Sequence, residues 1–299
     1  MSRDALVVGL SEYAHAAALG QVNATARAIA ERLELFGQFR VNDLEAADAD
    51  KRVAQVGKLQ GQIPATWSRS DLETALIRLF QPAPEQQDDL ALFYFAGYAY
   101  VSSLSTARPE LGSNGPDNPS VPQRETFLWT SDANPSAGIH GLSLNWLQRL
   151  IHASPLSQGL VLLDCYTTAA TFSFGNLTVG SEPGCDRLLL ATCQRIPTRS
   201  ATQVSGAGQT ATVQQTVQQT KAVLPQSLFA QALLEGLDPY RSELGVVTSL
   251  FLQNWVQTIF EGRAIQTCFE RSGGAIAITR TAHDPCPYKG LAYFDCNGD

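Results

Sequence analysis

The sequence predicts an α/β fold in which a mostly parallel central sheet carries helices on both faces. Almost entirely apolar runs with the length of buried strands occur at residues 5–9, 90–95, 160–163 and 187–192. Strands that are apolar on both faces are typical of a parallel sheet covered on both sides. Segments with helical periodicity lie between these runs, and this alternation is the pattern of α/β proteins.

The composition bounds the function. A chain of 299 residues is long enough for one large α/β domain or two modest ones. Its apolar content of 44% and charged content of 16% are ordinary for a soluble globular protein. The 21 basic and 28 acidic residues give a net charge of −7, and no basic run is interleaved with aromatic residues. Nucleic acid is therefore not expected as the main partner.

Neither a membrane segment nor a cofactor is expected. No apolar segment approaches the roughly eighteen residues that span a bilayer, and MSRDALVVGL leads directly into a strand-like run rather than forming a signal peptide. The six cysteines lack CxxC or Cys/His spacing suited to zinc, and no acidic loop of EF-hand type is present. Scattered thiols without a signal peptide predict a cytoplasmic protein without metal.

Further elements are predicted along the first part. Residues 22–35 carry an apolar stripe at helical spacing, and a weaker strand is expected near residues 39–41. A second helix is predicted over residues 69–80, with Ser70 as its N-cap and Glu73 completing a capping box.

The middle of the chain is more irregular. Residues 102–125 are rich in Gly, Pro, Ser and Asn and predict a long surface loop. A short strand at residues 127–130 and a helix at residues 144–151 follow. Residues 200–220 consist largely of Gln, Thr, Val, Ala, Gly and Ser, and predict a low-complexity linker.

Beyond this linker, an amphipathic helix closed by Gly236 is predicted over residues 228–237, and another helix over residues 249–259. A last strand is expected at residues 275–279. These elements predict a smaller second part that completes the same sheet.

Five stretches carry a family resemblance. They are ALVVGLSEY near the N-terminus, FYFAGYA at 93–99, LWTSDANP at 128–135, DCYTTA at 164–169 and LFAQALLEGL at 228–237. In this order they resemble the caspase/metacaspase fold, especially the bacterial caspase-like domains of the metacaspase and orthocaspase group. The likeness covers roughly residues 4–279.

The resemblance implies one caspase-like domain at residues 1–280. Its large-subunit-like part would span about 4–199, its linker 200–222 and its small-subunit-like part 223–280. The linker occupies the place at which active relatives are cut during maturation, and a passive tether is the simpler interpretation.

Both catalytic positions of the family hold tyrosine. The resemblance places Tyr98 at the histidine position and Tyr166 at the position of the nucleophilic cysteine. A cysteine hydrolase needs a thiolate and an imidazole near neutral pH, whereas a tyrosine hydroxyl has a reference pKa of about 10. The two rings would also fill part of any cleft. The resemblance therefore implies a proteolytically inactive domain that serves as a regulatory or protein-interaction module of a bacterial signalling protein.

Two alternatives remain at this stage. Cys165 could be a displaced nucleophile of an active cysteine-type endopeptidase with Arg/Lys preference, with Thr167 or Thr168 as the next candidates. Side chains alternate along a strand, however, so Cys165 is expected to face a packing layer, where cysteine behaves as a small hydrophobe. The second alternative is a purely structural α/β spacer.

Asp164 matches the aspartate that lines the pocket for a basic residue in metacaspases. The resemblance therefore implies that Asp164 lines a vestigial specificity pocket, which could still hold a basic peptide. It could equally cap the loop or helix that follows. Asp132 either shares this pocket or forms a turn. His15 is the histidine expected near the strand ends, while His140 and His152 are predicted to be ordinary surface residues.

The C-terminal stretch CPYKGLAYFD, at 286–295, resembles the start of bacterial STAND-type NTPase modules, which WD-repeat arrays often follow. No P-loop of the form GxxxxGK[ST] occurs in the sequence. Residues 281–299 would then lead into a downstream NTPase module, and the domain's partner would be another protein or these downstream domains. The alternative is a short irregular tail.

Overall fold

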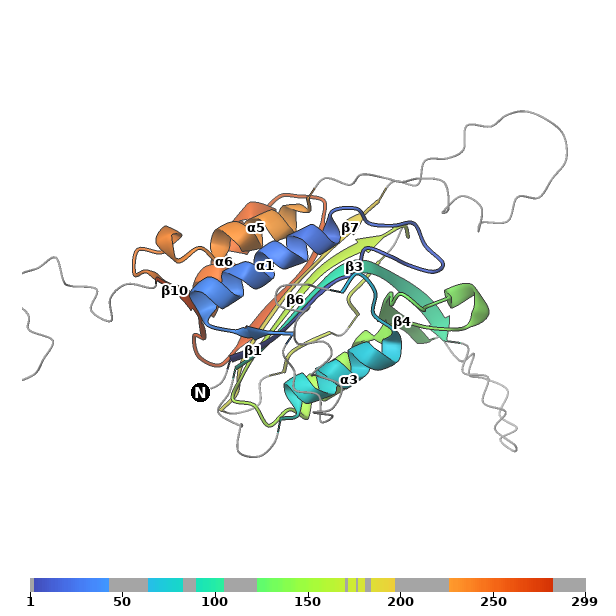
Figure 1. Ribbon diagram of the computed structural model, residues 1–299, viewed down its shortest axis with the longest axis horizontal. Helices are drawn as coiled ribbons and strands as arrows, with labels where there is room; N and C mark the ends of the chain where they lie inside the picture. The colour runs from blue at the N-terminus through green and yellow to red at the C-terminus, as the bar shows by residue number, and fades with distance from the viewer. Residues whose placement is uncertain are drawn as a thin grey trace, which may run out of the picture.

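The computed structural model describes residues 3–42, 64–82, 90–104, 123–169, 172–175, 177–180, 184–196 and 226–281. They build a central sheet with the strand order β2-β1-β3-β6-β7-β9 (Figure 1). These strands are β1 (Arg3–Gly9), β2 (Arg40–Val41), β3 (Leu90–Leu104), β6 (Gln158–Thr167), β7 (Asp186–Arg195) and β9 (Gln266–Ser272). All neighbours are parallel except β7 and β9, which are antiparallel. The predicted fold class is confirmed.

Helices cover both faces of this sheet (Figure 1). One layer contains α1 (Val22–Gly37), α5 (Leu228–Gly236) and α6 (Ser249–Phe260), and the other contains α3 (Arg69–Phe80) and α4 (Leu144–His152). Alternate side chains of β3 enter the two cores, with Tyr94 on the α1 side and Phe93 on the α3 side. Short 3-10 turns occur at Pro135–Ala137 and Pro239–Arg241. No helix in the described part of the chain is long and apolar enough to span a bilayer.

Strand β3 is longer than predicted. It continues through Gly97 to Leu104, and its second half pairs antiparallel with β4 (Gln123–Leu128), which pairs in turn with β5 (Leu142–Ser143). The predicted loop at residues 102–125 is therefore wrong at both ends, and residues 105–122 lie outside the described part. Aromatic and β-branched residues after Gly97 favour a strand, and β4 supplies a partner for it.

The C-terminal part completes the sheet with a different strand from the one predicted. β9 (Gln266–Ser272) is the last strand of the main sheet, whereas β10 (Ala277–Arg280) pairs with β8 (Val246–Thr248) in a separate two-stranded sheet. The sequence of β9, QTCFERS, is mostly polar and only partly buried, so it lacks the apolar run by which the other strands were recognised.

The N-terminus of α3 also differs from the prediction. Ser68 is the N-cap, and its hydroxyl accepts a hydrogen bond from the Asp71 amide at 3.2 Å. Ser70 already lies inside the helix, and Glu73 pairs with the Arg69 guanidinium at 2.7 Å rather than closing a capping box. The Gln/Thr linker and the NTPase-like signature fall on residues 197–225 and 282–299, outside the described residues.

Candidate site at the ends of β3 and β6

The two predicted dyad positions are neighbours in the sheet. Tyr98 on β3 is the register partner of Tyr166 on β6. Both side chains belong to the core on the α1 side, with exposed fractions of 8% for Tyr98 and 4% for Tyr166. Two phenol rings therefore lie where the parallel pairing of β3 with β6 ends, and they are packed into the core.

A third tyrosine, from the loop after β1, contacts this pair. The Tyr13 hydroxyl donates to the Leu10 carbonyl at 3.0 Å and accepts from the Tyr98 amide at 3.0 Å. The rings of Tyr13 and Tyr98 have centroids 5.1 Å apart. Sequence reasoning gave Tyr13 no role. Its position just after a buried strand was the available signal, because such loops meet at the carboxyl edge of a parallel sheet.

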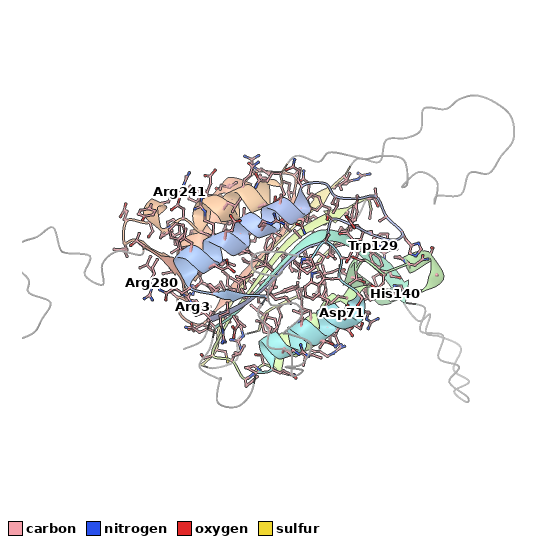
Figure 2. The ribbon with its side chains drawn as sticks, in the orientation of Figure 1. Arg3, Asp71, Trp129, His140, Arg241 and Arg280 are labelled. Carbon is pink, nitrogen blue, oxygen red and sulfur yellow. The ribbon has the colours of Figure 1, made fainter. Side chains whose placement is uncertain are left out.

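Trp129, which follows β4, completes this aromatic cover. Its ring centroid lies 6.0 Å from that of Tyr98 and 5.3 Å from that of Tyr100, and its backbone amide donates to the Tyr98 carbonyl at 2.8 Å. Figure 2 shows Trp129 and His140 near the extended end of β3. The ring of His140 stacks on Phe127 with centroids 4.7 Å apart, and its Nδ1 lies 3.1 Å from the Tyr100 hydroxyl oxygen. The prediction that His140 is an ordinary surface residue is therefore wrong.

Gly97 allows Tyr13 to approach β3. A Cβ atom at this position would lie 2.7 Å from the Tyr13 hydroxyl and 2.9 Å from Cζ of Phe95. We expect Gly97→Ala to lower the free energy of unfolding by about 1–3 kcal/mol, because the added methyl overpacks the site. Urea unfolding followed by circular dichroism measures this loss. Gly20→Ala is the control, since no atom lies within 4 Å of its Cβ position. An equal effect at both positions would contradict the expectation.

Asp164 lies buried against the start of α5. Its side chain is 2% exposed, and its carboxylate accepts a hydrogen bond from the Ser227 hydroxyl. Ser227 in turn caps α5 by accepting from the Ala230 amide at 2.8 Å. Burial raises the pKa of Asp164 to about 7, and the hydrogen bond from Ser227 acts in the opposite direction. Asp164 thus supports a helix cap through Ser227, a residue that sequence reasoning missed although it directly precedes the predicted helix.

Further hydroxyl groups share this buried region. The Tyr94 hydroxyl is fully buried and has no hydrogen-bond partner among the described residues. Its pKa is raised well above the ordinary value by burial first, and then by the Asp164 carboxylate and by Tyr166. Burial and Asp164 also raise the pKa of Tyr166. These phenols remain protonated at neutral pH, so the region can donate hydrogen bonds but offers no strong nucleophile.

Cys165 faces the opposite core, as the strand alternation predicts. It is fully buried on the α3 side and is the register partner of Cys193 on β7. Burial raises the pKa of the Cys165 thiol well above its ordinary value, with smaller contributions from Cys193 and Asp164. Of the next candidates, Thr167 is buried and accepts from the Ala169 amide at 3.2 Å, whereas Thr168 is exposed.

The remaining predicted residues lie at the surface. Asp132 is exposed and accepts a hydrogen bond from the Arg69 amide at 3.0 Å, which ties its turn to the start of α3. His15 and His152 are exposed. Within the described ranges, no group of three or more His, Cys, Asp and Glu side chains could hold a metal ion.

Of the comparisons with known proteins, the one with solved structures supports the fold. No protein-family model matches the chain, and no curated protein matches it in sequence. Among solved structures, the chain is similar to protein GSU0716 from Geobacter sulfurreducens, with a TM-score of 0.50 and 12% sequence identity, over 92% of this chain and 94% of that chain. At this identity the likeness shows the fold alone, and it extends over nearly the whole length of both chains.

Proposed function

We propose that this chain is a proteolytically inactive caspase-like domain that acts as a regulatory or protein-interaction module. The observation that carries the proposal is the register pair of Tyr98 and Tyr166. The family resemblance assigns the base and the nucleophile to these two positions. A base and a nucleophile must lie side by side on one face to exchange a proton, and adjacent strands bring these two positions together.

Neither tyrosine can replace the lost groups. Burial raises the pKa of Tyr98 and of Tyr166 above the ordinary value of 10.0, so both hydroxyls are neutral at pH 7. A neutral phenol is a weak nucleophile, and its conjugate base is nearly absent at this pH. Tyr13 and Trp129 pack against Tyr98 as well, so aromatic rings occupy the region around Tyr98.

A domain of this kind would act through binding. Its partner would be another protein or its own downstream domains in a bacterial signalling protein. The C-terminal resemblance to STAND NTPases suggests an NTPase module and WD repeats as these downstream domains. A basic peptide held at Asp164 is a narrower version of this proposal. It requires movement of α5, since Asp164 is buried and bonded to Ser227.

The alternative is a peptidase with Cys165 as a displaced nucleophile. A thiol must be ionised and accessible to attack a peptide. Cys165 is fully buried, and its pKa is raised. We therefore rank this alternative below the inactive domain.

A peptidase assay separates the two. We expect the purified chain to release no fluorophore from Arg-, Lys- or Asp-containing peptides above a heat-denatured blank, with or without calcium, because no activated nucleophile is available. The Cys165→Ala variant is assayed in parallel. Turnover that this variant abolishes would establish Cys165 as the nucleophile. Turnover that it retains would point to another nucleophile, and either result would end the proposal of an inactive domain.

A further inference from the structure

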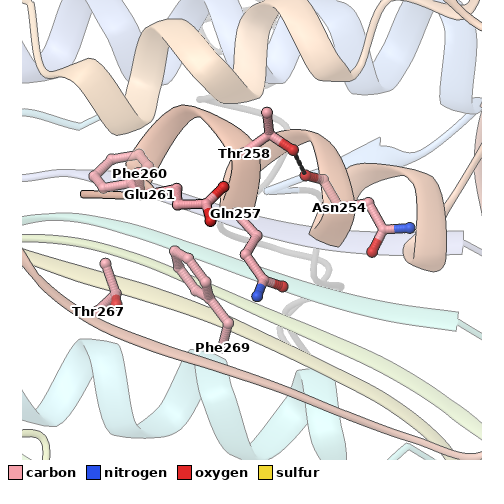
Figure 3. A pocket seen from close by; sticks show the side chains of 7 residues that line it. All are labelled: Asn254, Gln257, Thr258, Phe260, Glu261, Thr267 and Phe269. Atoms are coloured by element: carbon pink, nitrogen blue, oxygen red, sulfur yellow. Dashed lines mark hydrogen bonds between the residues drawn. The ribbon is translucent and has the colours of Figure 1, made fainter. Parts of the chain in front are cut away.

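The edge of the sheet formed by β9 adjoins a pocket. A cavity of about 450 Å³ lies between this strand and α6 (Figure 3). The helix side contributes Asn254, Gln257, Thr258, Phe260 and Glu261, and β9 contributes Thr267 and Phe269. Figure 3 shows the Gln257 side chain extending from the helix toward Phe269, and the Glu261 side chain at the end of the helix, above the Phe269 ring. The pocket therefore combines an aromatic ring with polar side chains at the margin of the sheet.

The chemistry of the pocket suits a cation. Glu261 brings a carboxylate, Asn254 and Gln257 bring amide oxygens, and none of the lining residues is Lys, Arg or His. Arg263, close in sequence, donates its Nε to the Ile259 carbonyl at 2.6 Å and does not line the cavity. A cation over an aromatic face is attracted by the ring, and a nearby carboxylate adds to this attraction. A lysine or arginine side chain matches this arrangement.

The strand itself offers a second point of attachment. Within the described part of the chain, β9 pairs with β7 alone and ends the strand order of the sheet. Such an edge presents backbone N–H and C=O groups to which an extended chain can add as a further strand. Thr267 and Phe269 lie two residues apart and both line the pocket, so alternate side chains of an added strand would enter it. The next residue, Glu270, lies on the other face of the strand, where its carboxylate accepts a hydrogen bond from the Val179 amide at 2.9 Å.

We propose that β9 and this pocket bind an extended segment of a partner protein, which adds a strand to the sheet and places a Lys or Arg side chain over Phe269 beside Glu261. The net charge of −7 favours a basic segment over a second copy of this acidic chain. The surface lies two strands away from β6 in the sheet order. Binding at β9 would give the proposed interaction module a class of partner, and it does not require the Tyr98/Tyr166 site to be either active or inactive.

The test uses the full chain and fluorescein-labelled peptides matched to the seven residues of β9. The peptides alternate Val and Thr around a central Lys, norleucine or Glu, and fluorescence anisotropy measures their Kd. We expect the Lys peptide to bind about fivefold more tightly than the norleucine peptide, and the Glu peptide to bind most weakly. Glu261→Gln should remove the advantage of Lys. Glu243→Gln, which removes an exposed charge from the loop before β8, should preserve it.

Backbone N-methylation of the Lys peptide tests the added strand. Methyl groups on the edge that faces β9 should abolish binding, whereas methyl groups on the other edge should not, because only one edge of an added strand donates to the sheet. Failure of the Lys peptide to bind, equal binding of the Lys and norleucine peptides, or indifference to N-methylation on both edges would overturn the proposal. A concentration-dependent dimer in sedimentation, dissociated by Phe269→Glu and unaffected by the peptides, would assign the edge to a second copy instead.

Discussion

The buried Asp164 carboxyl is expected to make the parent protein less stable as pH rises from about 4 to about 7, and the Asp164→Asn variant is expected to lack this loss of stability. The pKa of this carboxyl is raised from 3.8 to about 7, chiefly by burial. Between these two values the folded protein holds a proton that the unfolded chain has released, so the stability contribution of Asp164 is complete below pH 4 and is lost as pH approaches 7. A shift of this size corresponds to roughly 4 kcal/mol at neutral pH.

Urea unfolding at several values between pH 4 and pH 8 measures this effect as the difference between variant and parent. The difference is necessary because other titratable groups contribute to the pH dependence of both proteins alike. Glu243→Gln is the control for loss of one carboxylate at an exposed position. Parallel pH profiles for Asp164→Asn and the parent would show that this carboxyl has the same pKa in the folded and the unfolded protein, and would contradict the expectation.

The combined replacement of Tyr98→His and Tyr166→Cys is expected to create a reactive thiol in a less stable but folded protein. Loss of a buried aromatic ring costs about 3–5 kcal/mol, and both rings are almost fully buried. The register places the new imidazole beside the new thiol. A neighbouring imidazole lowers the pKa of a thiol, so alkylation by iodoacetamide at about pH 6.5 should be roughly tenfold faster than in Tyr166→Cys alone.

Mass spectrometry locates the alkylated residue and separates it from the buried Cys165. Near-ultraviolet circular dichroism establishes that both variants are folded. Equal alkylation rates in the single and double variants would contradict the assignment of Tyr98 and Tyr166 to the two dyad positions. Peptide hydrolysis is a stricter outcome and is not required, because the rings of Tyr13 and Trp129 remain packed at this site.

Local patterns in the sequence were sufficient for much of the fold. The apolar runs marked the central parts of β1, β6 and β7 and the first part of β3, and helical periodicity marked α1, α4, α5 and α6 within two residues of their observed ends. These elements bury side chains at regular spacing, so the pattern is visible without knowledge of their partners. The alternation that placed Cys165 and Tyr166 on opposite faces follows from the same regularity.

Local sequence patterns did not predict β9 or the second half of β3. β9 is partly exposed along most of its length, and it is a strand because β7 offers it an edge. The second half of β3 likewise depends on β4, which begins nineteen residues after β3 ends in the chain. Pairing of this kind arises from contacts between distant segments, and local strand preference alone does not identify the partner.

By itself, the sequence determined the α/β class, the buried strands and the presence of tyrosine at positions 98 and 166. Only the tertiary structure decided how those tyrosines meet in register, how the Tyr13 hydroxyl reaches the Tyr98 amide across 85 positions, and how Ser227 reaches Asp164 across 63 positions. The physical reason is the range of the interactions. Periodic burial is a local property of a segment, whereas a buried hydroxyl or carboxyl is satisfied by whichever distant group the packing brings to it.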